Sequence, residues 1–214
     1  MLPAFVWLFF WLMEDKYQPE PKRYIFFTFL AGMLAVPLVL PVEEFAAQYV
    51  AGFGLIVVWA LLEELFKFGA AYIVALRAKV FDEPLDAVIY MVTAALGFSA
   101  LENALFLFTP LYQGDALHSV LVGDLRFMGA MLLHILASAT VGFAMGFAFY
   151  KPARARRWAA FWGVILAATL HACFNFFILG GGGVMFATFV ALWLFIIVTL
   201  LLAERIKEPG KDYR

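Results

Sequence analysis

Residues 53–76 read FGLIVVWALLEELFKFGAAYIVAL, and this stretch decides what kind of fold the chain adopts. It is long enough to cross the hydrocarbon core of a bilayer, which takes about 20 apolar residues in a helix. Its middle nevertheless carries Glu63, Glu64 and Lys67. Each ionisable group at mid-helix costs at least about 2.5–3.5 kcal/mol on insertion scales, so such groups usually mark function. The stretch therefore predicts a membrane-spanning helix that holds part of a functional site.

The rest of the chain has the composition of a membrane protein. Of its 214 residues, 65% are hydrophobic and 14% are charged, whereas soluble domains average about 45–50% apolar and about 25% charged residues. Five further segments are long and apolar enough to span a bilayer, namely 24–41, 85–108, 125–150, 158–179 and 184–203. A shorter apolar segment, 1–13, precedes them. We therefore expect an all-α, polytopic bundle of about seven transmembrane helices in a single domain over residues 1–214.

The basic residues fall on one side of this expected bundle. Number the seven expected helices from the N-terminus, with segment 1–13 as the first. The loops after the odd-numbered helices and the C-terminal tail then contain Lys16, Lys22, Arg23, Arg77, Lys79, Lys151, Arg154, Arg156, Arg157, Arg205, Lys207, Lys211 and Arg214. Only Arg126 lies in a loop on the other side, and Lys67 lies inside a span. The positive-inside rule then puts the C-terminus in the cytoplasm and the N-terminus outside. No basic arm or stripe indicates a nucleic-acid partner, so the lipid bilayer is the expected surrounding.

Two smaller features also give expectations. Residues 41–52 contain Pro41 and look like an interfacial connection between two spans, so Glu43 and Glu44 are interpreted as a solvated edge. Cys173, the one cysteine, lies in an apolar run and is interpreted as a small buried hydrophobic residue. A single cysteine excludes both an internal disulfide and a cysteine metal cluster.

Polar residues lie close together on four of the expected helices, and on three of them a spacing of three or four puts polar side chains on one helix face. The groups are Glu63, Glu64 and Lys67; Glu102 and Asn103, which follow Phe98; His134 and Ser138; and His171 and Asn175. At 1.5 Å per residue, Glu63, Glu102, His134 and His171 lie about 9–15 Å from the outer ends of their spans. Unrelated polar substitutions would not align at one depth on helices that alternate in direction. We therefore expect one assembled site in the outer half of the bilayer.

Such a set can activate water in two ways. Without a metal, Glu63 would take a proton from water, and His171 and Asn175 would donate hydrogen bonds to the developing oxyanion. With a divalent metal such as zinc, His134, His171 and one or both of Glu63 and Glu102 would be ligands. Sequence does not separate these alternatives, and both describe a membrane hydrolase.

Other functions use the same residues differently. A proton- or ion-coupled transporter could use Glu63, Glu64, Glu102 and Lys67 as a relay, although such carriers often contain an inverted repeat and none is evident here. A haem-binding membrane protein could use two histidines, His134 and His171, as axial ligands. Simple structural explanations are interhelical hydrogen bonds for Ser138 and Asn175 and an ion pair for Glu63 and Lys67.

The ordered set of motifs resembles the PrsW family of intramembrane proteases. The motifs are Glu63-Glu64-x-x-Lys67, Glu83-Pro84-Leu85-Asp86, Phe98-x-x-x-Glu102-Asn103, His134-x-x-x-Ser138 and His171-x-x-x-Asn175. The resemblance runs from about Val57 to Asn175, and Ala87 departs from it where a glycine is expected. PrsW proteins are similar to CAAX prenyl endopeptidases and bacteriocin-immunity membrane proteins, but Glu102 stands where those enzymes have a histidine, which argues against a prenyl-protein substrate.

The resemblance implies a membrane-embedded peptidase whose catalytic helices lie at about 53–179. Its implied catalytic residues are Glu63, Glu64, Glu102, His134 and His171, with Lys67, Asn103, Ser138 and Asn175 in supporting or oxyanion roles. The implied partner is a single-span membrane protein, such as an anti-sigma factor, cut by site-1-type cleavage near its extracytoplasmic side. The implied location is a cell membrane, in particular a bacterial inner membrane. No cofactor, or a divalent metal such as zinc, fits this expectation.

Overall fold

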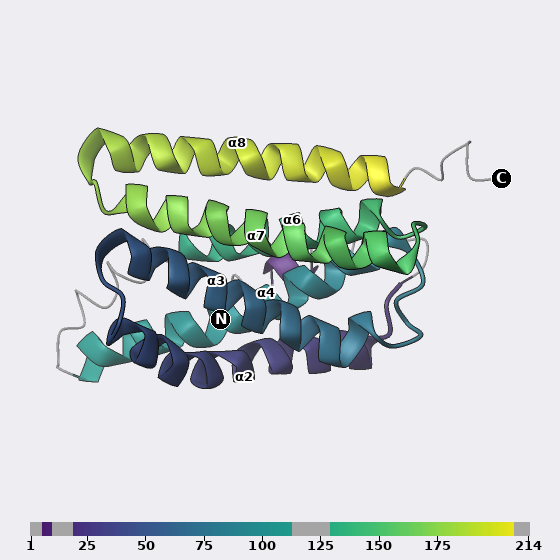
Figure 1. Cartoon of the computed structure of the whole chain (residues 1–214), viewed down its shortest axis with the longest axis horizontal. Helices are drawn as coiled ribbons and strands as arrows, with labels where there is room; N and C mark the ends of the chain where they lie inside the picture. The colour runs from purple at the N-terminus through teal and green to yellow at the C-terminus, as the bar shows by residue number, and fades with distance from the viewer. Residues whose placement is uncertain (1–5, 10–18, 113–128, 208–214) are drawn as a thin grey trace.

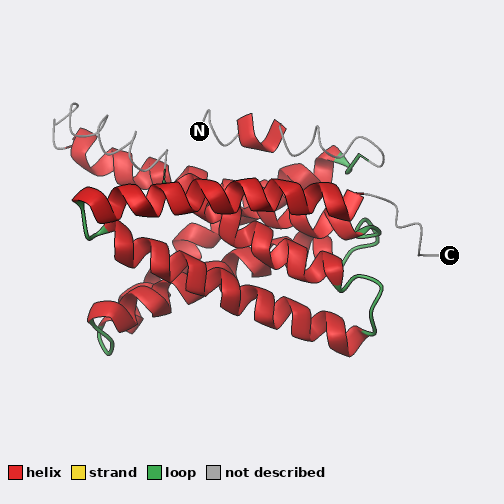
Figure 2. Cartoon of the chain, turned by 90° about the horizontal axis from the view of Figure 1, so that it is seen from above, coloured by secondary structure: helices red, strands yellow, loops and turns green. Residues whose placement is uncertain are grey.

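The computed structural model describes residues 6–9, 19–112 and 129–207, and every regular element in these ranges is helical (Figure 2). The long helices, in chain order, are α2 (Lys22–Ala47), α3 (Gly52–Ala71), α4 (Pro84–Tyr112), α6 (Ala130–Phe147), α7 (Ala153–Ile178) and α8 (Gly182–Lys207). A short π-helix, η1 (Tyr72–Leu76), extends α3. The helices run back and forth along one direction, with α8 at one edge of the bundle and α2 at the other (Figure 1).

The helices have the length and composition of membrane spans. Among the described residues, five helices are long and apolar enough to cross a bilayer, namely α2, α4, α6, α7 and α8. Helix α3 is also apolar but carries Glu63, Glu64 and Lys67. The predicted all-α bundle is therefore confirmed, and the chain is a multi-pass membrane protein. Of the first predicted segment only residues 6–9 are described, and they are helical; the rest lies outside the described residues.

The end of α2 differs from the sequence prediction. The predicted connection at 41–52 is wrong, because α2 continues through Pro37 and Pro41 to Ala47. A proline removes one backbone hydrogen bond from a helix. Membrane helices tolerate prolines because neighbouring groups satisfy the freed carbonyls. The indole N–H of Trp59 on α3 donates to the carbonyl of Glu43 at 3.1 Å. This bond holds the last turns of α2 against α3.

Helix α4 lies at the centre of the bundle and packs closely against two neighbours. Cβ atoms on Gly32 and Gly97 would collide with the carbonyls of Ala94 and Phe29, so α2 and α4 approach each other through their backbones. On the other side, a Cβ on Gly142 of α6 would lie 2.5 Å from the Cα of Val88. Small residues permit this close approach between membrane helices.

The start of α4 is fixed by a buried carboxylate. Asp86 is fully buried, and its Oδ2 accepts hydrogen bonds from the backbone N–H groups of Asp82 at 2.9 Å and Glu83 at 2.8 Å. Backbone N–H groups at a helix start have no partner within the helix, so an acceptor here stabilises the first turn. One turn later, the hydroxyl of Tyr90 donates to Glu20, just before α2.

Candidate active site

The Glu64 carboxylate is the most heavily hydrogen-bonded group inside the bundle. Its Oε1 accepts from the Lys67 ammonium at 2.6 Å and from His171 Nδ1 at 2.9 Å, while its Oε2 lies 3.4 Å from the Ser138 hydroxyl. The residue is fully buried. A buried charge is tolerated only when it is paired and hydrogen-bonded. Glu64 thus joins α3 to α6 and α7 by polar contacts.

Lys67 compensates this charge and also reaches a second helix. Its ammonium lies 2.8 Å from His134 Nδ1 and 4.9 Å from the centre of the Phe98 ring. The i,i+3 spacing of Glu64 and Lys67 on α3 makes their direct contact possible. Because an ammonium has no acceptor, His134 Nδ1 must be the acceptor in this bond.

The tautomers of both histidines follow from their partners. His134 accepts at Nδ1, so its proton is on Nε2, which lies 3.1 Å from Glu102 Oε2 and donates to it. His171 donates a hydrogen bond from Nδ1 to Glu64, so its proton is on Nδ1 and its lone pair is on Nε2. A carboxylate that fixes a histidine in this way orients the other nitrogen and raises its basicity.

Glu63 faces both histidines without touching them. Its Oε2 lies 3.9 Å from His134 Nδ1, 3.9 Å from His171 Nε2 and 3.8 Å from the Lys67 ammonium. This oxygen is buried and has no hydrogen-bond partner among the described residues. An unpaired buried carboxylate oxygen costs free energy, so its environment suits a further bound atom. A water or a cation between Glu63 and His171 would satisfy both groups.

The structure brings most of the predicted site residues together. Glu63, Glu102, His134, His171 and Asn175 line one cavity of about 690 Å³ between α2, α3, α4, α6 and α7. Glu64, Lys67 and Ser138 lie behind this wall and are fully buried. Asn103 is different, because its amide donates to Ser99 on its own helix at 3.1 Å and the residue does not line the cavity.

Sequence reasoning missed two carboxylates that line the cavity, Glu43 and Glu44. Glu43, interpreted as part of a solvated edge together with Glu44, lies on the last turns of α2 and lines the same cavity. Its Oε1 is buried and has no hydrogen-bond partner within the described ranges. The pair Glu43-Glu44 repeats the spacing of Glu63-Glu64, but the prolines before it concealed that the helix continues.

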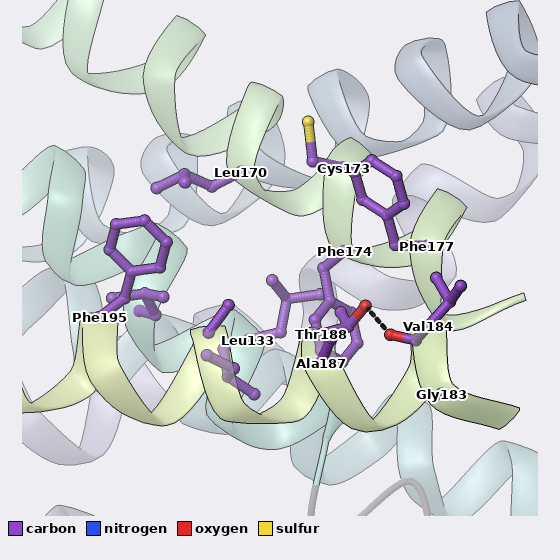
Figure 3. Close-up of a pocket in the computed structure, with 13 residues that line it drawn as sticks. Leu133, Leu170, Cys173, Phe174, Phe177, Gly183, Val184, Ala187, Thr188 and Phe195 are labelled. Carbon is purple, nitrogen blue, oxygen red and sulfur yellow. Dashed lines mark hydrogen bonds between the residues drawn. The ribbon is translucent and has the colours of Figure 1, made fainter. Parts of the chain in front are cut away.

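A second cavity lies on the opposite side of α6 and α7 and is of a different kind. It has a volume of about 550 Å³ and lies between α7 and α8, with Leu133 of α6 in its wall (Figure 3). Its walls are apolar and carry no charged side chain. Cys173 is exposed here, so the prediction that it is buried is wrong. In a membrane protein an apolar run can face lipid as readily as the interior.

The cavity with Glu63 can hold a divalent metal. One ligand atom each from Glu63, His134 and His171 lies within 4.8 Å of the others. Zinc ligands lie about 2.0–2.2 Å from the ion, so two ligands of a tetrahedral site are about 3.4 Å apart. The observed separations of 3.9 Å from Glu63 need only a small closure. His134 would have to release Lys67 from Nδ1 to bind, whereas His171 Nε2 and Glu63 are ready as they stand.

The geometry argues against the haem alternative. The rings of His134 and His171 have centroids 5.1 Å apart and are nearly perpendicular, at 84°. Two axial ligands must lie on opposite faces of a macrocycle, and this edge-on contact leaves no space for one. A buried carboxylate within water-bridging reach of a histidine instead fits the expected hydrolase. An all-helical membrane bundle built around such a site has the arrangement expected of a membrane-embedded hydrolase.

Comparison with known proteins gives the family. The family described as "PrsW family intramembrane metalloprotease" matches residues 20–202. A protein named Protease PrsW from Geobacillus kaustophilus is 31% identical over 202 residues, covering 89% of this chain and 84% of that protein. Proteins of the same name from Clostridioides difficile and Bacillus subtilis are each 26% identical, covering 84% and 81% of this chain and 77% and 78% of their own. No solved structure matches the chain.

The chain therefore belongs to the PrsW family of intramembrane proteases. Its activity is that of a membrane peptidase, and its substrate is a membrane protein. The family match covers helices α2 to α7 and α8 as far as residue 202, so the fold and the cavity described above are those of the family region.

Proposed function

We propose that this peptidase hydrolyses its substrate in the cavity of about 690 Å³, with Glu63 and His171 acting on the attacking water. The observation that carries the proposal is the Oε2 of Glu63, which has no hydrogen-bond partner among the described residues and lies 3.9 Å from His171 Nε2. A water between them would donate one hydrogen bond to the Glu63 carboxylate and the other to the lone pair of His171 Nε2. A positioned carboxylate of this kind is a general base that contributes about 10²–10⁴-fold to a rate.

The other site residues have roles that follow from their contacts. Glu64 holds His171 in one tautomer, and Lys67 balances the charge of Glu64. His134 lines the cavity, and its Nε2–H, oriented by Glu102, is the proposed proton donor to the leaving amine. Asn175 lies on the cavity wall one turn from His171, so its amide can donate to the developing oxyanion.

A divalent metal, zinc in particular, is the proposed cofactor; Glu63, His171 and His134 would hold it, and the ion would take the place between Glu63 and His171 that the water has without a metal. When bound, such an ion polarises the scissile carbonyl and lowers the pKa of water. The family description as a metalloprotease supports this choice. Glu64 and Glu102 would then fix the orientation of the ligand histidines by the same hydrogen bonds that the structure contains.

The proposed substrate is a single-span protein anchored in a bacterial cytoplasmic membrane, an anti-sigma factor being one such protein. The named relatives come from bacteria. The charge bias of the loops puts the start of α6 and the end of α7 outside, and His134 and His171 lie nearer to these ends. Cleavage is therefore proposed near the extracytoplasmic side.

The test uses purified protein in lipid vesicles together with a single-span substrate. We expect Glu63→Gln and His171→Ala each to lower kcat/KM by at least about 100-fold, as the loss of a positioned base or its partner predicts. Asp82→Asn is the control, because Asp82 is exposed at the start of α4, far along the chain from these groups. Wild-type rates in both site variants would contradict the proposal. Chelation followed by metal analysis in the same assay reveals whether activity and bound metal are lost together.

A further inference from the structure

We infer that Glu43 makes this cavity selective for substrates with a basic side chain, lysine or arginine, beside the cleaved bond. The inference rests on the proposed function and adds a specificity residue to it. It starts from the position of Glu43, which lies on α2 outside all of the motifs that carry the family resemblance. Glu43 nevertheless lines the same cavity as Glu63, His134 and His171.

The position of Glu43 is held by the fold. Trp59, one turn before Glu63 on α3, donates its indole N–H to the carbonyl of Glu43 at 3.1 Å. Trp59 lines the cavity as well. The backbone of Glu43 is therefore tied to the helix that carries Glu63, and its side chain has a defined place at the cavity wall.

The charge balance of the cavity is one-sided. Its lining includes four carboxylates, those of Glu43, Glu44, Glu63 and Glu102, but no lysine or arginine among the described residues. Lys67 lies behind the wall, where it contacts Glu64 and His134. A cleft lined by one sign of charge with apolar walls attracts the opposite charge.

Two carboxylate oxygens in this cavity need a partner. Oε2 of Glu63 is buried without a hydrogen-bond partner in the described part of the chain, and the water or metal at the reaction centre can satisfy it. Oε1 of Glu43 is likewise buried and unpartnered. An ammonium or guanidinium of the substrate would satisfy this oxygen with a charge-assisted hydrogen bond. A neutral side chain would leave it unpaired, and that difference is the basis of selectivity.

The place of Glu43 in the cavity wall fits a residue beside the reaction centre. Glu43 and Glu63 come from different helices, and the cavity between them is bounded by Phe98 and Glu102 of α4. In a substrate peptide bound at Glu63, the side chain beside the cleaved bond would therefore point toward α2. The pairing would be desolvated by the apolar residues of α2 in the same wall, Val36, Val39 and Leu40, and desolvation strengthens a charge pair.

The experiment compares three single-span substrates that differ in one residue flanking the cleaved bond, with lysine, glutamine or glutamate there. For the wild type, we expect kcat/KM to fall in that order, with at least about tenfold between lysine and glutamine, as truncating a buried charge pair costs this much or more. Equal kcat/KM for all three substrates would overturn the inference and leave the proposed function standing. Absence of cleavage of every substrate would instead contradict the proposed function.

Enzyme variants separate Glu43 from the other carboxylates. Glu43→Gln is expected to reduce the lysine-to-glutamine ratio about tenfold, and Glu43→Lys is expected to shift the preference toward the glutamate substrate. Asp82→Asn removes a negative charge from an exposed position and should leave the ratio as it is. An unchanged ratio in Glu43→Gln would overturn the inference, and so would an equal loss of kcat/KM for all three substrates.

Discussion

At the level of single residues, the Glu64 carboxylate and the Lys67 ammonium form the centre on which both histidines depend. Each of them is fully buried, and their contact of 2.6 Å joins two charges that water does not reach. Lys67 also fixes the tautomer of His134, and Glu64 fixes that of His171. The pair therefore determines which nitrogen of each histidine carries the proton.

This dependence gives a prediction for stability. Lys67→Met should lower the free energy of unfolding by about 3–5 kcal/mol, because it leaves Glu64 as an unpaired buried charge. The double variant Lys67→Met with Glu64→Gln should regain much of that loss, because it removes both charges. Denaturation of the purified proteins in detergent, monitored by circular dichroism, measures the free energies of unfolding of both variants. A double variant no more stable than Lys67→Met alone would contradict the account.

Sequence spacing predicted this site well but not completely. The i,i+4 spacing of His134 with Ser138 and of His171 with Asn175 placed each pair on one helix face, and the structure brings these faces together around Glu63. Asn103 was expected beside Glu102, yet it bonds to Ser99, because neighbouring residues on a helix point about 100° apart. The catalytic roles of all these residues stay predictions.

At the level of elements, helix-helix distance is set by glycines rather than by large side chains. Gly32, Gly97 and Gly142 let α2, α4 and α6 meet backbone to backbone. Helix α6 carries His134, and α4 carries Glu102, so the 3.1 Å contact between these residues depends on that close approach. Nothing in the sequence pattern indicated that α2 extends past Pro41 toward the site.

A pair of glycine substitutions tests this packing. Gly142→Ala should destabilise the protein by about 1–3 kcal/mol and reduce proteolysis, because its Cβ would lie 2.5 Å from the Cα of Val88 and would push α6 away from α4. Gly69→Ala on α3 is the matched control, since nothing lies within 4 Å of a Cβ added there. Thermal unfolding in detergent and cleavage rates are measured together. Equal stability of the two variants would argue against the role of the glycine contacts.

At the level of the whole molecule, the predicted orientation decides which side of the membrane the cavity serves. The number and order of the long helices were predictable because each apolar segment matches the bilayer thickness. The predicted orientation follows from the basic residues alone, and Lys151, Arg154, Arg156 and Arg157 are four of the thirteen on the expected cytoplasmic side. N-terminus outside, C-terminus inside, and a single domain over residues 1–214 all stay predictions.

Labelling of introduced cysteines tests the orientation in intact cells. In a Cys173→Ser background, Asp82→Cys at the start of α4 should resist a membrane-impermeant maleimide until the cells are opened. Tyr49→Cys, between α2 and α3, should react from outside, because both positions are exposed at opposite ends of the bundle. The reverse pattern would invert the topology and place the cleavage site on the cytoplasmic side.

The three charges on α3 also bear on how the protein is made. Each of Glu63, Glu64 and Lys67 opposes entry into lipid by about 2.5–3.5 kcal/mol at mid-helix, and α3 is not among the five helices that qualify as spans by length and composition. Its partners on α6 and α7 are synthesised later than α3 itself. During biosynthesis α3 therefore depends on the ion pair between its own Glu64 and Lys67 and on its contact with α2. The chemistry of the mature enzyme thus imposes an order on its membrane insertion.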